Sequence, residues 1–72
     1  MPRGEKYPAI MNMIEKYEYK YKKPMNFQML IDYIQEAIGI SRKTAREYAD
    51  DLVKMNYITV DQNSIVTRSF NG

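Results

Sequence analysis

Apolar side chains recur at helical spacing in three stretches of the 72-residue chain. In the first stretch they lie four, three and four residues apart: Ile10, Ile14, Tyr17 and Tyr21. Charged residues fill many of the intervening positions, so one apolar stripe can face a core while the rest faces water. Pro8 suits the first turn of a helix, because its missing N–H would be unpaired there in any case. The pattern predicts a helix over about residues 8–20.

The end of this first helix has two interpretations. Three tyrosines alternate with charged residues between positions 17 and 21, which is the period of a strand. Pro24 also biases Lys23 away from helical geometry. A short extended segment near residues 19–23 is therefore an alternative to a continuous helix.

Residues that start and stop helices bound the second and third stretches. Asn26 is a good N-cap, and Gly39 readily adopts the left-handed conformation that ends a helix. Apolar residues follow Asn26 at helical spacing: Phe27, Leu30, Ile31, Ile34 and Ile38. Ser41 can cap a third helix, and the apolar side of that helix is formed by Ala45, Tyr48, Ala49 and Leu52. We expect helices over about residues 27–38 and 42–55.

The chain changes to strand-forming residues after the third helix. Asn56 suits a left-handed position, and the runs 57–60 and 65–67 are rich in β-branched and aromatic residues. A polar cluster at 61–64 separates the two runs, so they predict a hairpin over about 57–68. The expected core contains Ile10, Ile14, Leu30, Ile34, Ile38, Ile40, Ala45, Ala49, Leu52 and Ile58.

Three helices followed by a hairpin make an α+β fold, with a tight Gly-containing turn between the second and third helices. In the stretch 34–48, an apolar residue, Gly39, a second apolar residue and the capping Ser41 precede a basic helix start. This stretch resembles the winged helix-turn-helix DNA-binding domains. Residues 52–58 look like the passage from recognition helix to wing in small prokaryotic, especially archaeal, regulators. The resemblance implies a three-helix winged helix-turn-helix with a C-terminal β-hairpin wing.

The resemblance also implies a function, sequence-specific binding of double-stranded DNA by a transcriptional regulator that inserts residues 42–55 into the major groove. At about 100° per residue, Arg42, Lys43 and Arg46 lie opposite the apolar side of this helix. An arginine can bridge guanine O6 and N7, whereas a lysine suits phosphate. The expected DNA contacts are Ser41, Arg42, Lys43, Thr44, Arg46 and Glu47 on the helix, Arg68 on the wing, and Lys22 and Lys23 after the first helix.

The same helix face has a second interpretation as a merely solvated surface. Opposite charges lie four residues apart in three pairs: Lys43 with Glu47, Arg46 with Asp50, and Asp50 with Lys54.

The wing turn carries Asp61 where the resembled domains have a basic residue. Together with a net charge of only +2, Asp61 favours an alternative function, a winged helix module that binds proteins in a replication or transcription assembly.

A second basic cluster lies at the end of the first helix: Lys16, Lys20, Lys22 and Lys23. Residues 1–23 carry six Lys and Arg against three acidic residues. The lysines are interleaved with Tyr19 and Tyr21, and three interpretations are open: contacts to backbone phosphates, flanks of a stacking platform in a single-strand binder, or a solvated helix end. Met11, Met13 and Tyr19 fall partly outside the apolar stripe, which suggests a homodimer face.

The length and composition of the chain limit the number of domains and the catalytic and metal chemistry that we expect. Seventy-two residues make one domain, with residues 1–7 and 69–72 expected as flexible tails. Without Cys and His the chain lacks thiolate ligands, the commonest metal ligand and the commonest general base, so we expect no enzyme activity, metal or cofactor. No small-molecule ligand is evident either.

No apolar run is long enough to span a membrane and residues 1–6 lack the apolar stretch of a signal peptide, which predicts a cytoplasmic protein.

Overall fold

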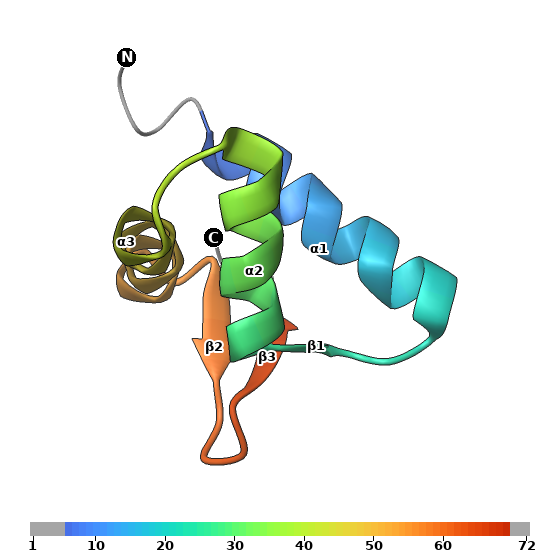
Figure 1. The fold of residues 1–72 in the computed structure, drawn as a ribbon. Helices are drawn as coiled ribbons and strands as arrows, with labels where there is room; N and C mark the ends of the chain where they lie inside the picture. Colours follow the sequence, from blue (N-terminus) through green and yellow to red (C-terminus); the bar gives the residue numbers. More distant parts are fainter. Residues whose placement is uncertain (1–5, 70–72) are drawn as a thin grey trace.

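The computed structural model describes residues 6–69, and this part of the chain forms three helices and three short strands (Figure 1). The helices are α1 (Tyr7–Tyr21), α2 (Phe27–Ile38) and α3 (Arg42–Lys54). The strands are β1 (Met25–Asn26), β2 (Ile58–Val60) and β3 (Ile65–Arg68). The fold is therefore α+β, as the sequence predicts. In Figure 1, α2 lies between α1 and α3, and the hairpin of β2 and β3 extends below the helices.

Helix α1 starts beside Pro8 and continues until Lys22, which ends it in the left-handed conformation (φ 58°). The Lys22 N–H donates a hydrogen bond to the Glu18 carbonyl oxygen at 2.9 Å. The alternative of an extended segment over 19–23 is therefore wrong. Extended geometry begins only after Pro24, where the chain enters β1.

The caps of α2 and α3 are those that the sequence predicts. Asn26 Oδ1 accepts a hydrogen bond from the Gln28 N–H at 2.8 Å, and Ser41 Oγ accepts one from the Thr44 N–H at 3.2 Å. Gly39 ends α2 in the left-handed conformation (φ 74°), which residues with a Cβ adopt only with strain. Local sequence thus sets both ends of the short turn between α2 and α3.

The three strands form one antiparallel sheet in the order β1-β3-β2. The hairpin lies close to its predicted position, and its strands pair Ile58 with Arg68 and Val60 with Val66. Strand β1 is the element that the sequence pattern did not predict. It pairs with β3 through Met25 opposite Val66, so the link between α1 and α2 becomes one edge of the sheet.

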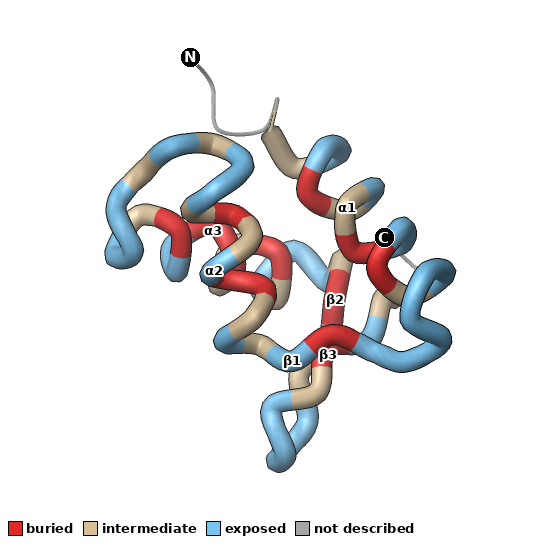
Figure 2. Tube along the Cα trace, turned by 45° about the vertical axis from the view of Figure 1, so that its right-hand side comes forward, coloured by how far each residue is buried: buried red, intermediate tan, exposed pale blue. Residues whose placement is uncertain are grey.

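The core gathers apolar side chains from every helix and strand of the described chain (Figure 2). It contains Ile10, Ile14, Tyr17, Met25, Leu30, Ile31, Ile34, Ala45, Tyr48, Ala49, Leu52, Ile58 and Val66. The prediction of Ile38 and Ile40 as enclosed residues is wrong, because both flank the exposed turn at Gly39 and are only partly buried. Met25 and Val66 are wholly buried instead, and they meet across the β1–β3 pair.

Residues at the inner ends of the two expected tails belong to the described part of the chain. Tyr7 already belongs to α1, and the Ser69 N–H donates to the Tyr57 carbonyl oxygen at 2.9 Å. Residues 1–5 and 70–72 of the predicted tails lie outside the described residues. In the part that is described, none of the helices combines the length and the apolar composition that crossing a membrane requires.

The importance of β1 for the core is testable at Met25. We expect Met25→Ala to lower the free energy of unfolding by about 2–5 kcal/mol, because truncating a wholly buried side chain leaves a cavity. Urea denaturation followed by circular dichroism measures this loss. The matched control is Met55→Ala, since the Met55 side chain is 40% exposed and its loss should cost less than about 1 kcal/mol. Equal losses in the two variants would contradict the structural role of β1.

Candidate functional site

Helix α3 divides into an apolar side and a charged side. The apolar side is buried: Ala45, Tyr48, Ala49 and Leu52. The first turns of the other side carry exposed residues that we call the α3 surface: Arg42, Lys43, Arg46 and Glu47. The unpaired N–H groups of the helix N-terminus add partial positive charge at the same place. The structure thus brings together the positions that the sequence predicts as the main DNA contacts.

Arg42 is engaged by side chains of α2. Its Nη1 donates to Asp32 Oδ1, and its Nη2 donates to Gln28 Oε1 at 2.8 Å. Both charged side chains are at least half exposed, so water screens the ion pair and its contribution is at most about 1 kcal/mol. Sequence reasoning missed these partners because they lie ten and fourteen residues before Arg42, on another helix. Arg42 therefore tethers the start of α3 to α2, by contacts weak enough for a phosphate to replace.

Lys43 and Arg46 are the cations of the α3 surface that form no ion pair within the described part of the chain. The three pairs proposed from four-residue spacing, Lys43 with Glu47, Arg46 with Asp50 and Asp50 with Lys54, are not formed in this part of the chain. These three pairs therefore lend no support to the interpretation of this face as a merely solvated surface.

The hydroxyl groups of Ser41 and Thr44 belong to the cap of α3. Ser41 Oγ donates to Thr44 Oγ1 at 3.0 Å and accepts from the Thr44 N–H at 3.2 Å. These bonds hold the first turn of the helix in shape. Both residues thus position the α3 surface, whatever further contacts they make.

Asp61 shapes the turn of the hairpin. Its Oδ1 accepts hydrogen bonds from the Asn63 N–H at 2.8 Å and the Ile65 N–H at 3.0 Å. Ser64 completes the turn in the left-handed conformation (φ 63°). Sequence reasoning considered Asp61 only as an acidic residue in place of a basic one, and it overlooked this structural role, in which a carboxylate accepts hydrogen bonds from the backbone of its own turn. The exposed tip carries Gln62 and Asn63 beside it.

Arg68 joins the sheet to α1. Its Nε donates to Glu18 Oε1 at 2.7 Å, and its Nη1 lies 3.8 Å from Glu15 Oε2. Arg68 was the cation expected to attract DNA to the wing. In the structure its charge is balanced by two carboxylates fifty residues and more earlier in the chain.

The structure does not bring Lys22 and Lys23 to the α3 surface. They follow the last turn of α1, at the end of that helix that lies furthest from α3 in both Figure 1 and Figure 2. Helix α2 stands between the two regions. The basic residues predicted as DNA contacts therefore fall on two separate surfaces.

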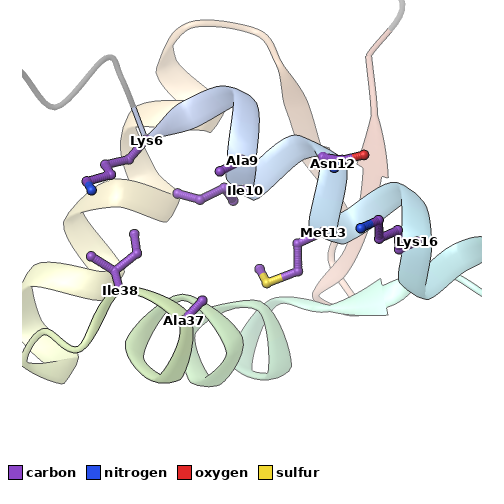
Figure 3. A pocket seen from close by; sticks show the side chains of 8 residues that line it. All are labelled: Lys6, Ala9, Ile10, Asn12, Met13, Lys16, Ala37 and Ile38. Atoms are coloured by element: carbon purple, nitrogen blue, oxygen red, sulfur yellow. The ribbon is translucent and has the colours of Figure 1, made fainter.

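A hollow of about 450 Å³ lies between α1 and α2 (Figure 3). Its lining is mainly apolar, with a lysine toward each end: Lys6, Ala9, Ile10, Asn12, Met13, Lys16, Ala37 and Ile38. Met13 belongs to this hollow, whereas Met11 lines a different one of about 420 Å³ beside Met55 and Tyr57. Tyr19 lines neither. The three residues suggested as a homodimer face thus do not share one hollow.

The described residues 6–69 contain no group of three His, Cys, Asp or Glu side chains that could hold a metal ion. No protein-family model, no curated protein and no solved structure matches this chain. Its function is therefore inferred from the geometry and the charge of the surfaces described above.

The link between Arg68 and α1 predicts an effect on stability. A double-mutant cycle of Arg68→Ala and Glu18→Ala should give a coupling free energy of about 0.5–1 kcal/mol, because both side chains are partly exposed and joined at 2.7 Å. Urea denaturation at low and high salt measures it, and the coupling should shrink as salt rises. The control cycle pairs Glu18→Ala with Lys23→Ala, which should be additive. Additive losses for Arg68 and Glu18 would refute the link.

The role of Asp61 predicts a change in the hairpin. Asp61→Lys removes the acceptor of two backbone hydrogen bonds and should destabilise the turn by about 1–2 kcal/mol. Faster hydrogen exchange at the Asn63 and Ile65 amides reports this loss. Asp61→Asn keeps an acceptor oxygen, and Gln62→Lys adds the same lysine without removing the carboxylate, so both should leave exchange nearly unchanged. Equally fast exchange in Asp61→Lys and Gln62→Lys would mean that charge, and not the turn, matters.

Proposed function

We propose that the protein is a winged helix-turn-helix module that binds double-stranded DNA through the first turns of α3, and acts as a transcriptional regulator by occupying its site. Supporting this, the order of three helices and the β1-β3-β2 sheet is compatible with a winged helix layout. The observation that carries the proposal is the pair of cations Lys43 and Arg46, which form no ion pair with residues 6–69. They are exposed on the first turns of a helix whose N-terminus itself favours anions.

The chemistry of the α3 surface suits a duplex. Arg46 offers a planar group that can bridge the acceptors of guanine, and Lys43 offers a point charge for a phosphate. Arg42 would bind a phosphate or a base in place of Asp32, with which it forms an exposed ion pair. Ser41 and Thr44 hold the helix start that carries these groups. Catalysis has no part in this proposal.

The wing has a smaller part in the proposed complex. Arg68 is held by α1 carboxylates and Asp61 by the turn itself, so the hairpin offers little uncompensated positive charge. The affinity would come mainly from α3. The position of the wing beside the duplex would then be set by the sheet and not by attraction to phosphate.

A second candidate function, a module that binds another protein, is favoured by the hollow of about 450 Å³ between α1 and α2. Its apolar lining offers a surface that a partner side chain can bury. In this case the α3 surface would be only a solvated face. The two functions differ in whether Lys43 and Arg46 matter for binding to DNA.

Duplex binding tests the proposal directly. We expect the variant Lys43→Ala/Arg46→Ala to bind a duplex of about 20 base pairs more weakly and to lower the slope of log affinity against log salt by about one, because Lys43 is the phosphate contact of the pair. Fluorescence anisotropy at several salt concentrations gives both quantities. The charge-matched control is Lys22→Ala/Lys23→Ala, which removes two cations away from α3 and should leave the slope nearly unchanged. An unchanged slope in the α3 variant, or no duplex binding by the wild type, would favour the protein-binding alternative.

A further inference from the structure

The last turns of α1 present the most exposed aromatic rings of the described chain. Tyr19 is 78% exposed and Tyr21 is 48% exposed. Lysine amines lie over both rings: Lys22 Nζ is 4.4 Å from the Tyr19 ring centroid, and Lys20 Nζ is 5.3 Å from that of Tyr21. We call this region the tyrosine–lysine surface: Lys16, Tyr19, Lys20, Tyr21, Lys22 and Lys23. Large exposed rings beside cations are typical of a binding surface.

The helix geometry separates these residues from the acids of α1. At about 100° per residue, Tyr19, Lys16, Lys20 and Tyr21 follow one another around roughly 200° of the helix circumference. Glu15 and Glu18 occupy the remaining arc, where Arg68 pairs with both. Within residues 6–69 no carboxylate pairs with the lysines of the tyrosine–lysine surface. Among the described residues, its positive charge is therefore not neutralised by an ion pair.

A hollow of about 220 Å³ adjoins this surface and is lined by aromatic rings, methionines and two of the lysines. The Tyr17 ring is 4.7 Å from that of Tyr21 and 5.9 Å from that of Tyr33, measured between centroids. Lys16 and Lys20 line the same hollow, and no acidic side chain of the described chain does. Flat apolar walls beside amines suit a ligand with an aromatic part and an anionic part, and they disfavour a cation.

The backbone at Lys22 adds an independent observation. Lys22 ends α1 in the left-handed conformation, which costs a residue with a Cβ roughly 1 kcal/mol and which Gly or Asn would adopt more easily. This conformation accompanies a Lys22 amine that lies over the Tyr19 ring. The left-handed turn at Lys22 thus accompanies a further cation beside the exposed Tyr19 ring.

We infer that the tyrosine–lysine surface binds single-stranded nucleic acid. One base stacks on Tyr19 and another enters the hollow beside Tyr21, while Lys16 and Lys20 between them neutralise the phosphates of the strand. A base-paired duplex would bind this surface more weakly, because its bases are already stacked on one another and cannot stack on the tyrosine rings. The surface is separate from the α3 surface, so this inference does not depend on the proposed function.

The test is anisotropy with labelled oligothymidylate and oligouridylate of about 12 nucleotides. We expect at least one of them to bind, and Tyr19→Ala to weaken that binding by about 5- to 150-fold. Tyr19→Phe keeps a ring and should retain the affinity, whereas Tyr19→Leu keeps apolar bulk without a flat ring and should lose it. Because Tyr19 is so exposed, none of these variants should unfold the protein, which circular dichroism checks.

Two further variants test the role of the lysines and the location of the single-strand site. Lys16→Ala/Lys20→Ala should lower the salt slope for the single strand by about 1.4, since each phosphate contact contributes about 0.7. The charge-matched variant Lys43→Ala/Arg46→Ala should leave single-strand binding unchanged, even if it abolishes duplex binding. If the wild type binds the single strand but does not bind the duplex, the proposed function is wrong and this inference stands.

Four results would overturn the inference. The first is that neither oligonucleotide binds, and the second is that Tyr19→Leu binds as tightly as Tyr19→Phe. The third is that poly-L-glutamate of similar charge competes as well as the oligonucleotide, which would indicate a surface for acidic proteins. The fourth is that the Lys43→Ala/Arg46→Ala variant loses the single strand as fully as the Tyr19→Ala variant, which would place the strand on α3.

Discussion

The fold depends on the pairing of a two-residue strand with the hairpin. Met25 and Val66 face each other across β1 and β3, and both are wholly buried. The Phe27 N–H also donates to the Ser64 carbonyl oxygen at 2.8 Å, which ties the start of α2 to the hairpin turn. Two-stranded hairpins are marginal in water, whereas three strands packed on helices are stable. Because β1 directly precedes α2, this pairing also sets the direction in which α2 leaves the sheet and presents α3.

Two arginines act mainly within the structure. Arg42 connects α3 to α2, and Arg68 connects β3 to α1. The ion pairs of these two arginines engage Asp32, Glu15 and Glu18, so these carboxylates do not pair with other cations of the described chain. Among the other cations, Lys43 and Arg46 lie on the α3 surface and four lysines lie on the tyrosine–lysine surface, with α2 between them. A net charge of +2 thus conceals two separate surfaces of different chemistry, one with an exposed helix start and one with exposed aromatic rings.

Local features of the sequence predicted the helices and their caps, because a helix and its caps are encoded within a few residues. Asn26, Gly39 and Ser41 act as expected. Strand β1 was missed because two residues show no periodicity and the partner strand lies forty residues further along the chain. The candidate residues of α3 were placed together correctly, but the partners of Arg42 and Arg68 come from other elements and leave no local signal. The DNA-binding function itself stays a prediction.

The central claim, that duplex DNA and a single strand bind to different surfaces, is tested most directly by nuclear magnetic resonance. Uniformly ¹⁵N-labelled protein is titrated first with a duplex and then, in a second sample, with oligothymidylate, and the amide shifts are mapped onto the structure. We expect the duplex to shift the amide signals of residues 41–47 and to leave those of residues 16–23 unchanged, and the single strand to do the reverse, as the claim of two surfaces requires. One common set of shifted amides for both ligands would contradict it.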